Sequence, residues 1–457
     1  MKLEVLMSGE LAGTLSYAVE SQLYAFRYSS DWLSRTGRCV LSPTLPLKEG
    51  EGKARERHSA AVRQFFENLL PEGQALDDAA STNKIAKSNL MGLLAALGGE
   101  TAGALQLRLP GVEPSAAEAV RVLSHEELSE RIRARPYQPF SVWDGQVWLA
   151  IAGYQDKLAV YEGDRGWALA DGDRRASTCI LKPEPVSAQL SGLTGNEFFC
   201  MRLAHWARLP VADVALIHVP EPVLVVKRFD RERTSDGIAR LHIIDGCQAL
   251  GLSAALKYER PYGDTRDVRE LRDGASLPML FELLERSQRP VAERLALLRW
   301  TIFQVLIGNT DAHAKNLSFH VSSEGISLAP AYDLVCGRVF EGEKLLDTFA
   351  MAIGDAFHAE ELSPYEWANF AHACELPFKQ VSAELSRMAK RVREGLPKAC
   401  EDALIAGVAP ALVEKLSALI SAECERQAAM APDVAKVDPA LFRTAQYRSG
   451  LAWFVGK

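Results

Sequence analysis

The chain has 457 residues, of which 48% are hydrophobic and 24% are charged. This amount of apolar material suffices for two or three subdomains, each with a buried core. The net charge of −7 argues against a chain whose main role is nucleic-acid binding, because contacts to phosphate need a basic face.

In chain order, the first segment, residues 1–108, alternates short strand-like runs with turns around one helical piece and predicts a small α+β subdomain. Residues 109–140 form a helical connector, with its helix expected over 114–135. Strands dominate residues 141–235, and apolar residues at helical spacing dominate residues 236–457. A strand-rich part followed by a helix-rich part predicts an α+β fold of two lobes.

The cysteines, the N-terminus and the distribution of apolar residues indicate where the protein is expected to act. The eight cysteines are scattered, with no C-x-x-C pair and no zinc-like cysteine–histidine spacing, which argues against structural zinc and a disulfide framework. The N-terminus lacks the basic start and apolar run of a signal peptide. Because no stretch of about 18 uncharged apolar residues occurs, we expect a cytoplasmic protein that makes no membrane contact.

A charged stretch, KYERPYGDTRDVRELRDGASL, lies early in the helical part, over residues 257–277. Runs of mixed charge are most often solvated faces. We therefore expect a surface loop here, with a binding role as the alternative.

The most informative stretch is IGNTDAHAKNLSF, which follows an apolar helix pattern. Gly308 is a natural helix stop. Asp311 and Asn316 come next, and two strand-like runs joined by the turn SSEG then lead to Asp333. A loop followed by a hairpin would bring these three polar side chains together.

Phosphoryl transfer explains this order of residues. The reaction needs a carboxylate that accepts the proton of the substrate hydroxyl, and oxygen ligands that hold Mg²⁺ against the triphosphate. The D-x-x-x-x-N spacing equals that of the protein-kinase catalytic loop, so Asp311 is the candidate base, and Asn316 and Asp333 are candidate Mg²⁺ ligands. Lys315 would then lie near the transferred phosphate and His313 beside the nucleotide. The alternative is a polar loop whose Asn and Asp only satisfy backbone groups.

A nucleotide site also needs a strand lysine that contacts the phosphates, and Lys182 follows an apolar run in STCILKPE. An ordinary edge-strand lysine is the alternative. Glu197, at the start of the next helix, could orient this lysine, or it could close a capping box with Thr194.

The run VLVVKRFDR offers a hinge for the base of the nucleotide. Backbone groups near Lys227 and Phe229 could meet an adenine, and Asp230 and Arg231 could close the hinge. The alternative is a strand end that carries a salt-bridged Arg–Asp cluster.

The run LAIAGYQDKLAV lies where a phosphate-covering loop is expected, upstream of the strand lysine. Ala152, Gly153 and Gln155 are its candidate ATP contacts. With a single glycine, an ordinary hairpin is the alternative.

Together these stretches resemble HipA-type kinases, the toxin components of HipBA toxin–antitoxin modules. The motifs that occur in the family's order and spacing are IAGYQDKLAV, STCILKPE, TGNEFFCMRLA, VVKRFDR, DGCQALGLSAALKYE, IGNTDAHAKNLSF and PAYDLV. The family's N-terminal subdomain is resembled in FRYSSDWL, LSPTLPL, FFENLLPEG and LGGETAGAL. The resemblance covers nearly the whole chain and is weakest after about residue 360.

The resemblance implies a bilobal protein-kinase-like fold and a serine/threonine-protein kinase that uses ATP and Mg²⁺. Its implied base is Asp311 and its implied metal ligands are Asn316 and Asp333. It also implies a HipB-like helix-turn-helix antitoxin as partner, with operator DNA bound mainly through the antitoxin. The implied substrate is a translation component, such as glutamyl-tRNA synthetase or another aminoacyl-tRNA synthetase, whose phosphorylation causes growth arrest and persistence.

One position departs from the family. The phosphate-loop serine that is autophosphorylated to shut the kinase off would lie two residues before the AG-x-Q-[DE]-K motif, at Ala150. Alanine has no hydroxyl to phosphorylate. Either this member is not regulated in that way, or the alanine is a substitution that traps the unphosphorylated state.

Two other functions compete with a toxin kinase. One is a pseudokinase-like module that binds the antitoxin as an operator co-repressor, and the intact set of polar site residues disfavours it. The other is a lipid or small-molecule kinase, which a wide apolar substrate groove would favour.

Overall fold

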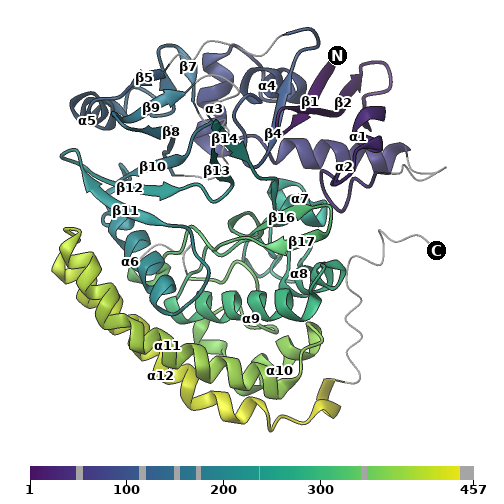
Figure 1. The fold of residues 1–457 in the computed structure, drawn as a ribbon. Helices are drawn as coiled ribbons and strands as arrows, with labels where there is room; N and C mark the ends of the chain where they lie inside the picture. The colour runs from purple at the N-terminus through teal and green to yellow at the C-terminus, as the bar shows by residue number, and fades with distance from the viewer. Residues whose placement is uncertain are drawn as a thin grey trace.

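The structure is a computed structural model that describes residues 1–47, 55–112, 120–148, 155–170, 176–235, 237–340 and 347–442. Its upper half is built on β-sheets and its lower half on helices, with the longest helices at the bottom (Figure 1). The predicted α+β fold with a mostly helical C-terminal lobe is confirmed.

The first subdomain is a four-stranded antiparallel sheet in the order β3-β2-β1-β4, covered by helices. Its strands are β1 (Lys2–Met7), β2 (Glu10–Ala18), β3 (Leu23–Tyr28) and β4 (Leu105–Arg108), and its helices are α1 (Ser30–Ser34), α2 (Arg55–Glu67), α3 (Gly73–Thr82) and α4 (Leu90–Leu97). Alternate residues Leu3, Val5 and Met7 are buried, as the period of two in a half-buried strand requires. Val5 pairs with Leu107, so β4 returns the chain to the first strand.

The second sheet has six antiparallel strands in the order β11-β12-β10-β8-β9-β5. The strands are β5 (Val120–Val122), β8 (Leu158–Gly163), β9 (Gly166–Ala170), β10 (Cys179–Pro183), β11 (Val214–His218) and β12 (Pro222–Lys227). The helix α6 (Leu193–Trp206) follows β10, and the short hairpin β6 (Val142–Trp143) and β7 (Gln146–Val147) precedes β8. This sheet carries the strand lysine and the hinge, so it forms the upper wall of the site.

The connector differs from its prediction. Of the helix expected over 114–135, residues 114–119 lie outside the described residues. The helix present in the rest is α5 (His125–Ala134), and Ser124 caps its N-terminus by accepting a hydrogen bond from the Glu127 N–H. Before that cap, β5 pairs with β9 and extends the six-stranded sheet. Two β-branched valines that alternate with an arginine suit an edge strand better than a helix.

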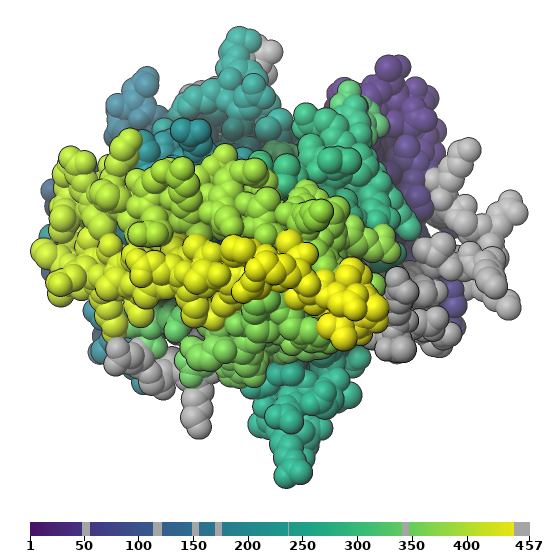
Figure 2. All heavy atoms as spheres, turned by 90° about the horizontal axis from the view of Figure 1, so that it is seen from below, coloured from purple at the N-terminus to yellow at the C-terminus, as the bar shows by residue number. Residues whose placement is uncertain are grey.

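The lower half is helical, with small sheets at its upper edge. Its helices are α7 (Gly246–Leu250), α8 (Leu277–Leu283), α9 (Pro290–Ile307), α10 (Pro364–Ala373), α11 (Phe378–Ile405) and α12 (Pro410–Val434). The remaining strands are β13 (Arg231–Thr234), β14 (Gly237–Arg240), β15 (Ile243–Asp245), β16 (Ser318–Ser322) and β17 (Gly325–Leu328). Figure 2 shows α11 and α12 side by side across the lower face, where they cover α6 and α9.

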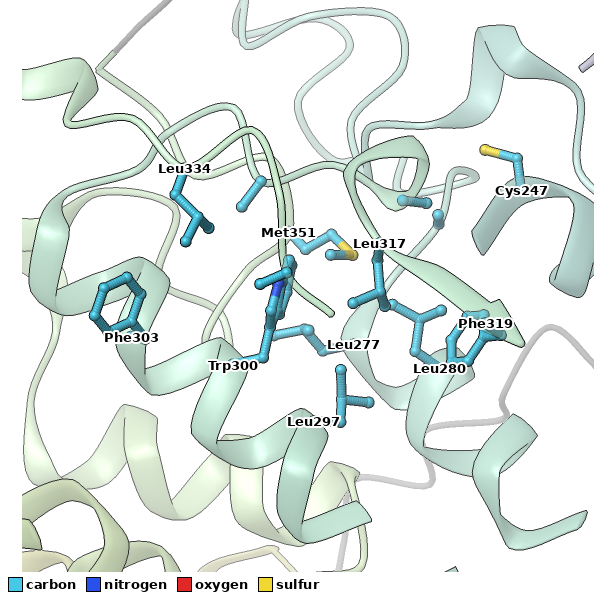
Figure 3. Packing of buried hydrophobic residues seen from close by; sticks show 14 of the residues in the cluster. Cys247, Leu277, Leu280, Leu297, Trp300, Phe303, Leu317, Phe319, Leu334 and Met351 are labelled. Carbon is cyan, nitrogen blue, oxygen red and sulfur yellow. The ribbon is translucent and has the colours of Figure 1, made fainter. Parts of the chain in front are cut away.

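The polar run, residues 309–316, follows α9, and this helix is anchored in the core of the lower lobe. Trp300 and Phe303 of α9 are buried, and Leu317 and Phe319, which follow the polar run, point into the same core (Figure 3). Burial of each such side chain is worth about 1.5–3 kcal/mol. The polar run is therefore fixed at both ends by packing. In the part of the chain that the structure describes, no helix has the length and apolar character needed to cross a membrane.

Candidate active site

A cavity between the six-stranded sheet and the helical lobe gathers most of the predicted site residues. Of these, Lys182, Lys227, Phe229, Asp230, His313, Lys315, Asn316 and Asp333 line it. The first subdomain contributes Asn68, Leu69, Glu72 and Ala102. The predicted contacts Ala152 and Gly153, and Ala150 before them, lie outside the described residues. Gln155 is described, and its Nε2 donates to the Pro183 carbonyl at 3.3 Å.

Lys182 lies on β10, buried between a helix and a loop. Its Nζ is 2.7 Å from Glu197 Oε1 on α6 and 2.6 Å from Asp333 Oδ1. Burial opposes the charge of the lysine, but the two carboxylates raise the pKa of Lys182 above its usual value. Burial also opposes the charge of Asp333, but Lys182 and Lys157 hold the pKa of Asp333 well below its usual range. Lys182, Glu197 and Asp333 thus form one buried ion-pair network, in which each charge shifts the pKa of its neighbours.

The open question about Glu197 is answered by its neighbours. The first turn of α6 is capped by Glu184, which accepts hydrogen bonds from the backbone N–H groups of Gly192 and Thr194. The hydroxyl of Thr194 is buried and has no hydrogen-bond partner among the described residues. Glu197 is therefore the partner of Lys182 and closes no capping box.

Lys157 also lines the cavity, although the sequence predicted no role for it. It is buried at the start of β8, one residue before the strand. Burial and the nearby Lys182 lower the pKa of Lys157 to about 8. The signal was present in the motif AG-x-Q-[DE]-K, whose last residue it is, and its position adds a second lysine beside the predicted phosphate site.

The loop after α9 is held by hydrogen bonds within itself. The helix ends at Ile307, and Gly308 adopts the left-handed conformation (φ +67°) that the predicted stop requires. Asn309 Oδ1 accepts the Asp311 N–H at 3.0 Å, and Asn316 Nδ2 donates to the Asp311 carbonyl at 2.8 Å. Because the amide nitrogen of Asn316 is used in this way, its amide oxygen is the atom that it can offer to a cation.

Asp311 presents a carboxylate beside this loop. Its side chain is 42% exposed, with Oδ1 4.0 Å from His313 Nε2 and 2.5 Å from the hydroxyl oxygen of Tyr258. Partial removal of its carboxylate from water raises the pKa of Asp311 to about 6, although the hydrogen bond from Tyr258 opposes the rise. Burial lowers the pKa of His313 to about 3, so its ring is neutral. Asp311 can therefore take a proton near neutral pH.

The predicted hairpin carries the third polar residue to the site. Strands β16 and β17 pair up to Ser322 and Gly325, with SSEG as their turn, which confirms the hairpin. Asp333 follows with φ +56°, a strained value for an aspartate that costs about 1–3 kcal/mol and is typical of functional positions. Its carboxylate and the Asn316 amide are oxygen donors of the kind that Mg²⁺ prefers, so the residues present fit this cation.

The hinge strand ends at Lys227, whose N–H already donates to the Asp213 carbonyl at 2.8 Å. Among the described residues, the backbone of Phe229 makes no hydrogen bond. Its ring lies 5.7 Å from that of Tyr332, centroid to centroid. The backbone of Phe229 is thus better placed than that of Lys227 to meet a base.

Asp230 belongs to a buried ionic cluster. Its carboxylate accepts hydrogen bonds from the guanidinium groups of Arg228 and Arg231 and from the Gly103 N–H. Burial disfavours its charge, but the two arginines hold the pKa of Asp230 well below its usual range. Glu100 of the first subdomain binds the same arginines. The Arg–Asp cluster that the sequence left as an alternative is present, and an ATP contact by Asp230 stays a prediction.

Lys315 is also fully engaged. Its Nζ is 2.6 Å from Asp245 Oδ2, 2.9 Å from Asn68 Oδ1 and 3.2 Å from the Asn68 carbonyl. It therefore joins the polar run to the first subdomain, and a contact with the transferred phosphate stays a prediction.

The expectation of a solvated surface loop over 257–277 is wrong for its first residues. Lys257 and Glu259 are buried, and Tyr258 reaches Asp311. Ion pairs with Glu72 and Arg272 compensate the buried charges. Glu72 lies 185 positions from Lys257 in the sequence, so the charge content of the segment alone could not reveal this partner.

Comparisons with known proteins find relatives over nearly the whole chain. The model for the HipA N-terminal domain matches residues 3–108, and that for the HipA-like C-terminal domain matches residues 149–396. The serine/threonine-protein kinase toxin HipA of Shewanella oneidensis is 33% identical over 448 residues, which cover 96% of this chain and 98% of that protein. The Y4mE protein of Sinorhizobium fredii is 33% identical over 88% of this chain and 92% of its own length. A solved complex of HipA, HipB and operator DNA from Shewanella oneidensis MR-1 has a chain with a TM-score of 0.84 and 33% identity, covering 95% of this chain and 100% of that one.

Proposed function

The chain belongs to the HipA family, and we propose that it is a serine/threonine-protein kinase that acts as the toxin of a toxin–antitoxin module by transferring the γ-phosphoryl group of ATP to a protein hydroxyl. The observation that carries the proposal is the ion-pair network of Lys182 with Glu197 and Asp333 next to the loop that holds Asp311 and Asn316. A kinase needs each of these groups in place at once.

The residues divide the work of the transfer. Lys182, oriented by Glu197, would bind the phosphates and release Asp333 from its ion pair. Asn316 and Asp333 would hold Mg²⁺, which neutralises charge on the triphosphate when it is bound. Asp311, with its raised pKa, would accept the proton of the attacking hydroxyl. The backbone of Phe229 would receive the adenine.

The test is radiolabelled ATP added to a cytosolic extract with the native chain or its Asp311→Asn variant. We expect one labelled protein band with the native chain and a roughly 10²–10⁴-fold lower rate with the variant, because the variant has lost its general base. No transfer by either protein would favour a co-repressor module. Label only in lipid or a small metabolite would favour a kinase of another class.

We also propose two protein partners, an antitoxin and a substrate. A HipB-like helix-turn-helix antitoxin would bind the chain and supply most of the contacts to operator DNA, in keeping with the net charge of −7. The substrate would be an aminoacyl-tRNA synthetase, such as glutamyl-tRNA synthetase, in the cytoplasm. Mass-spectrometric identification of the labelled band tests the substrate, and a DNA mobility shift with and without the antitoxin tests the partner.

We expect Ala150 to remove one form of regulation, autophosphorylation, from this kinase. Since it has no hydroxyl, autophosphorylation at this position cannot switch the enzyme off. We expect no phosphate in the peptide 145–158 after incubation with ATP and Mg²⁺. A phosphate found there by mass spectrometry would contradict this part of the proposal.

A further inference from the structure

The hydroxyl of Tyr258 lies 2.5 Å from Oδ1 of Asp311, as close as a hydrogen bond to a carboxylate commonly comes. We propose that Tyr258 is a positioning residue for the base: its hydroxyl occupies Oδ1 and fixes the plane of the carboxylate, so that Oδ2 faces the substrate hydroxyl. This inference rests on the proposed kinase function and deepens it.

The residue before the tyrosine is anchored to two other parts of the site. Lys257 is buried, and its Nζ is 2.7 Å from Glu72 Oε2 of the first subdomain. Its carbonyl accepts the N–H of Ala314, inside the polar loop, at 3.1 Å. The backbone that carries Tyr258 is therefore tied directly to the loop that carries Asp311.

The residue after the tyrosine is anchored as firmly. Glu259 is buried, and its carboxylate accepts hydrogen bonds from Arg272 Nε at 2.6 Å and from the Ala352 N–H at 2.8 Å. The backbone of Gly274 passes so close that a Cβ there would lie 1.8 Å from the Tyr258 carbonyl oxygen. The tyrosine thus sits on a backbone that is anchored on both sides and closely approached by Gly274.

The anchored backbone decides between two roles for the Tyr258 hydroxyl: positioning the base or receiving the phosphoryl group. A hydroxyl that receives the phosphoryl group also donates a hydrogen bond to the base, but its side chain must approach ATP and leave carrying the phosphate. The ring of Tyr258 is packed edge-on against His313, with centroids 5.0 Å apart and planes at 89°. A hydroxyl held in this way can orient a neighbour, which is the function of fixed groups that support a reacting one.

The same hydrogen bond also restricts the rotation of the Asp311 carboxylate. A carboxylate with one oxygen bound to a donor cannot rotate freely, so the other oxygen keeps one direction. The bond is charge-assisted and therefore stronger than one between neutral groups. Its loss should lower the rate of the chemical step and leave the binding of ATP as it was.

The experiment compares Tyr258→Phe with Tyr262→Phe, the same change at a tyrosine of the same segment that is 55% exposed. Initial rates of label transfer from ATP are measured at a fixed amount of cytosolic extract and varied ATP, and thermal unfolding is recorded for each protein. We expect Tyr258→Phe to lower the apparent kcat by roughly 10-fold, with an unchanged KM for ATP and an unchanged melting temperature. Tyr262→Phe should equal the native chain.

Several results would overturn the inference. An unchanged kcat in Tyr258→Phe would remove the positioning role, and a parallel change of kcat, KM and melting temperature would reduce it to packing. Phosphate on Tyr258 in the native chain would make the hydroxyl an acceptor instead. If the native chain transfers no label at all, the proposed function fails, and the inference fails with it.

Discussion

Lys182 and Glu197 lie 15 positions apart in the sequence and meet in the interior, with Nζ 2.7 Å from Oε1. The contact joins β10 to α6, and it leaves Lys182 free to hold Asp333 with its remaining hydrogens. A buried lysine between two carboxylates needs both to offset the cost of its desolvation. The pair therefore orients the lysine before any nucleotide arrives.

Replacing Glu197 by Gln should impair the kinase through this lysine. Without the negative charge of Glu197, Lys182 depends on Asp333 alone, so the phosphates draw the lysine away from Asp333 less easily. We expect a roughly 10–100-fold fall in kcat/KM for ATP, the equivalent of a lost charge-assisted hydrogen bond. Glu394→Gln, an exposed change on α11, is the matched control. Equal kinetics for both variants would show that the pair has no part in catalysis.

Asn316 is predicted to serve both the base and the cation. Asn316→Ala removes the amide oxygen together with the Nδ2 bond to the Asp311 carbonyl. We expect it to raise the Mg²⁺ concentration needed for half-maximal transfer and to lower the maximal rate by about 10²-fold or more. Asn316→Asp keeps an oxygen ligand but loses the N–H donor and adds a negative charge, so it should restore the Mg²⁺ requirement but not the rate. A magnesium titration of both variants that gives the native curve would contradict the metal role.

Local signals made much of the site predictable. Gly308, the Asp311-to-Asn316 spacing and the turn SSEG each report a short-range constraint, and the structure places them as expected. Tyr258 escaped prediction because its partner lies 53 positions away and its neighbours read as a solvated charge run.

The same reasoning explains the error in the connector and the unforeseen partners of Lys315. The segment at 120–122 forms a strand because β9 offers it an edge, which is a long-range contact that helical propensity cannot anticipate. Lys315 is paired with Asn68, which lies 247 positions away. Pattern reading finds residue types suited to a reaction, whereas the fold decides which of them are already engaged.

Glu100 should make the protein sensitive to acid. Burial disfavours its charge, but Arg240, Arg231 and Arg228 lower the pKa of Glu100 from 4.5 to about 2. A carboxyl whose pKa is depressed by folding adds stability that is complete above pH 4.5 and is lost as the pH falls toward 2. That contribution is about 3 kcal/mol.

The Glu100→Gln variant isolates this effect. It should be less stable than the native chain at pH 7, and its stability should change less between pH 5 and pH 3. Denaturant midpoints measured at pH 7, 5, 4 and 3 give the comparison, with the exposed Glu20→Gln as control. Parallel pH curves for the native chain and Glu100→Gln would contradict the assigned role.

Stability measurements can decide whether Lys315 has a structural or a catalytic role. The lysine is buried, and its ion pair with Asp245 also touches the N-terminus of α7, where Asp245 Oδ1 accepts the Gln248 N–H at 2.8 Å. Lys315→Met would leave the Asp245 carboxylate without its cation, which costs about 3–5 kcal/mol for a buried pair. Adding Asp245→Asn should recover part of this loss, because the neutral amide still caps the helix. A lysine that served only the phosphate would instead lose transfer activity in Lys315→Met with an unchanged denaturation curve, and the second substitution would then restore nothing.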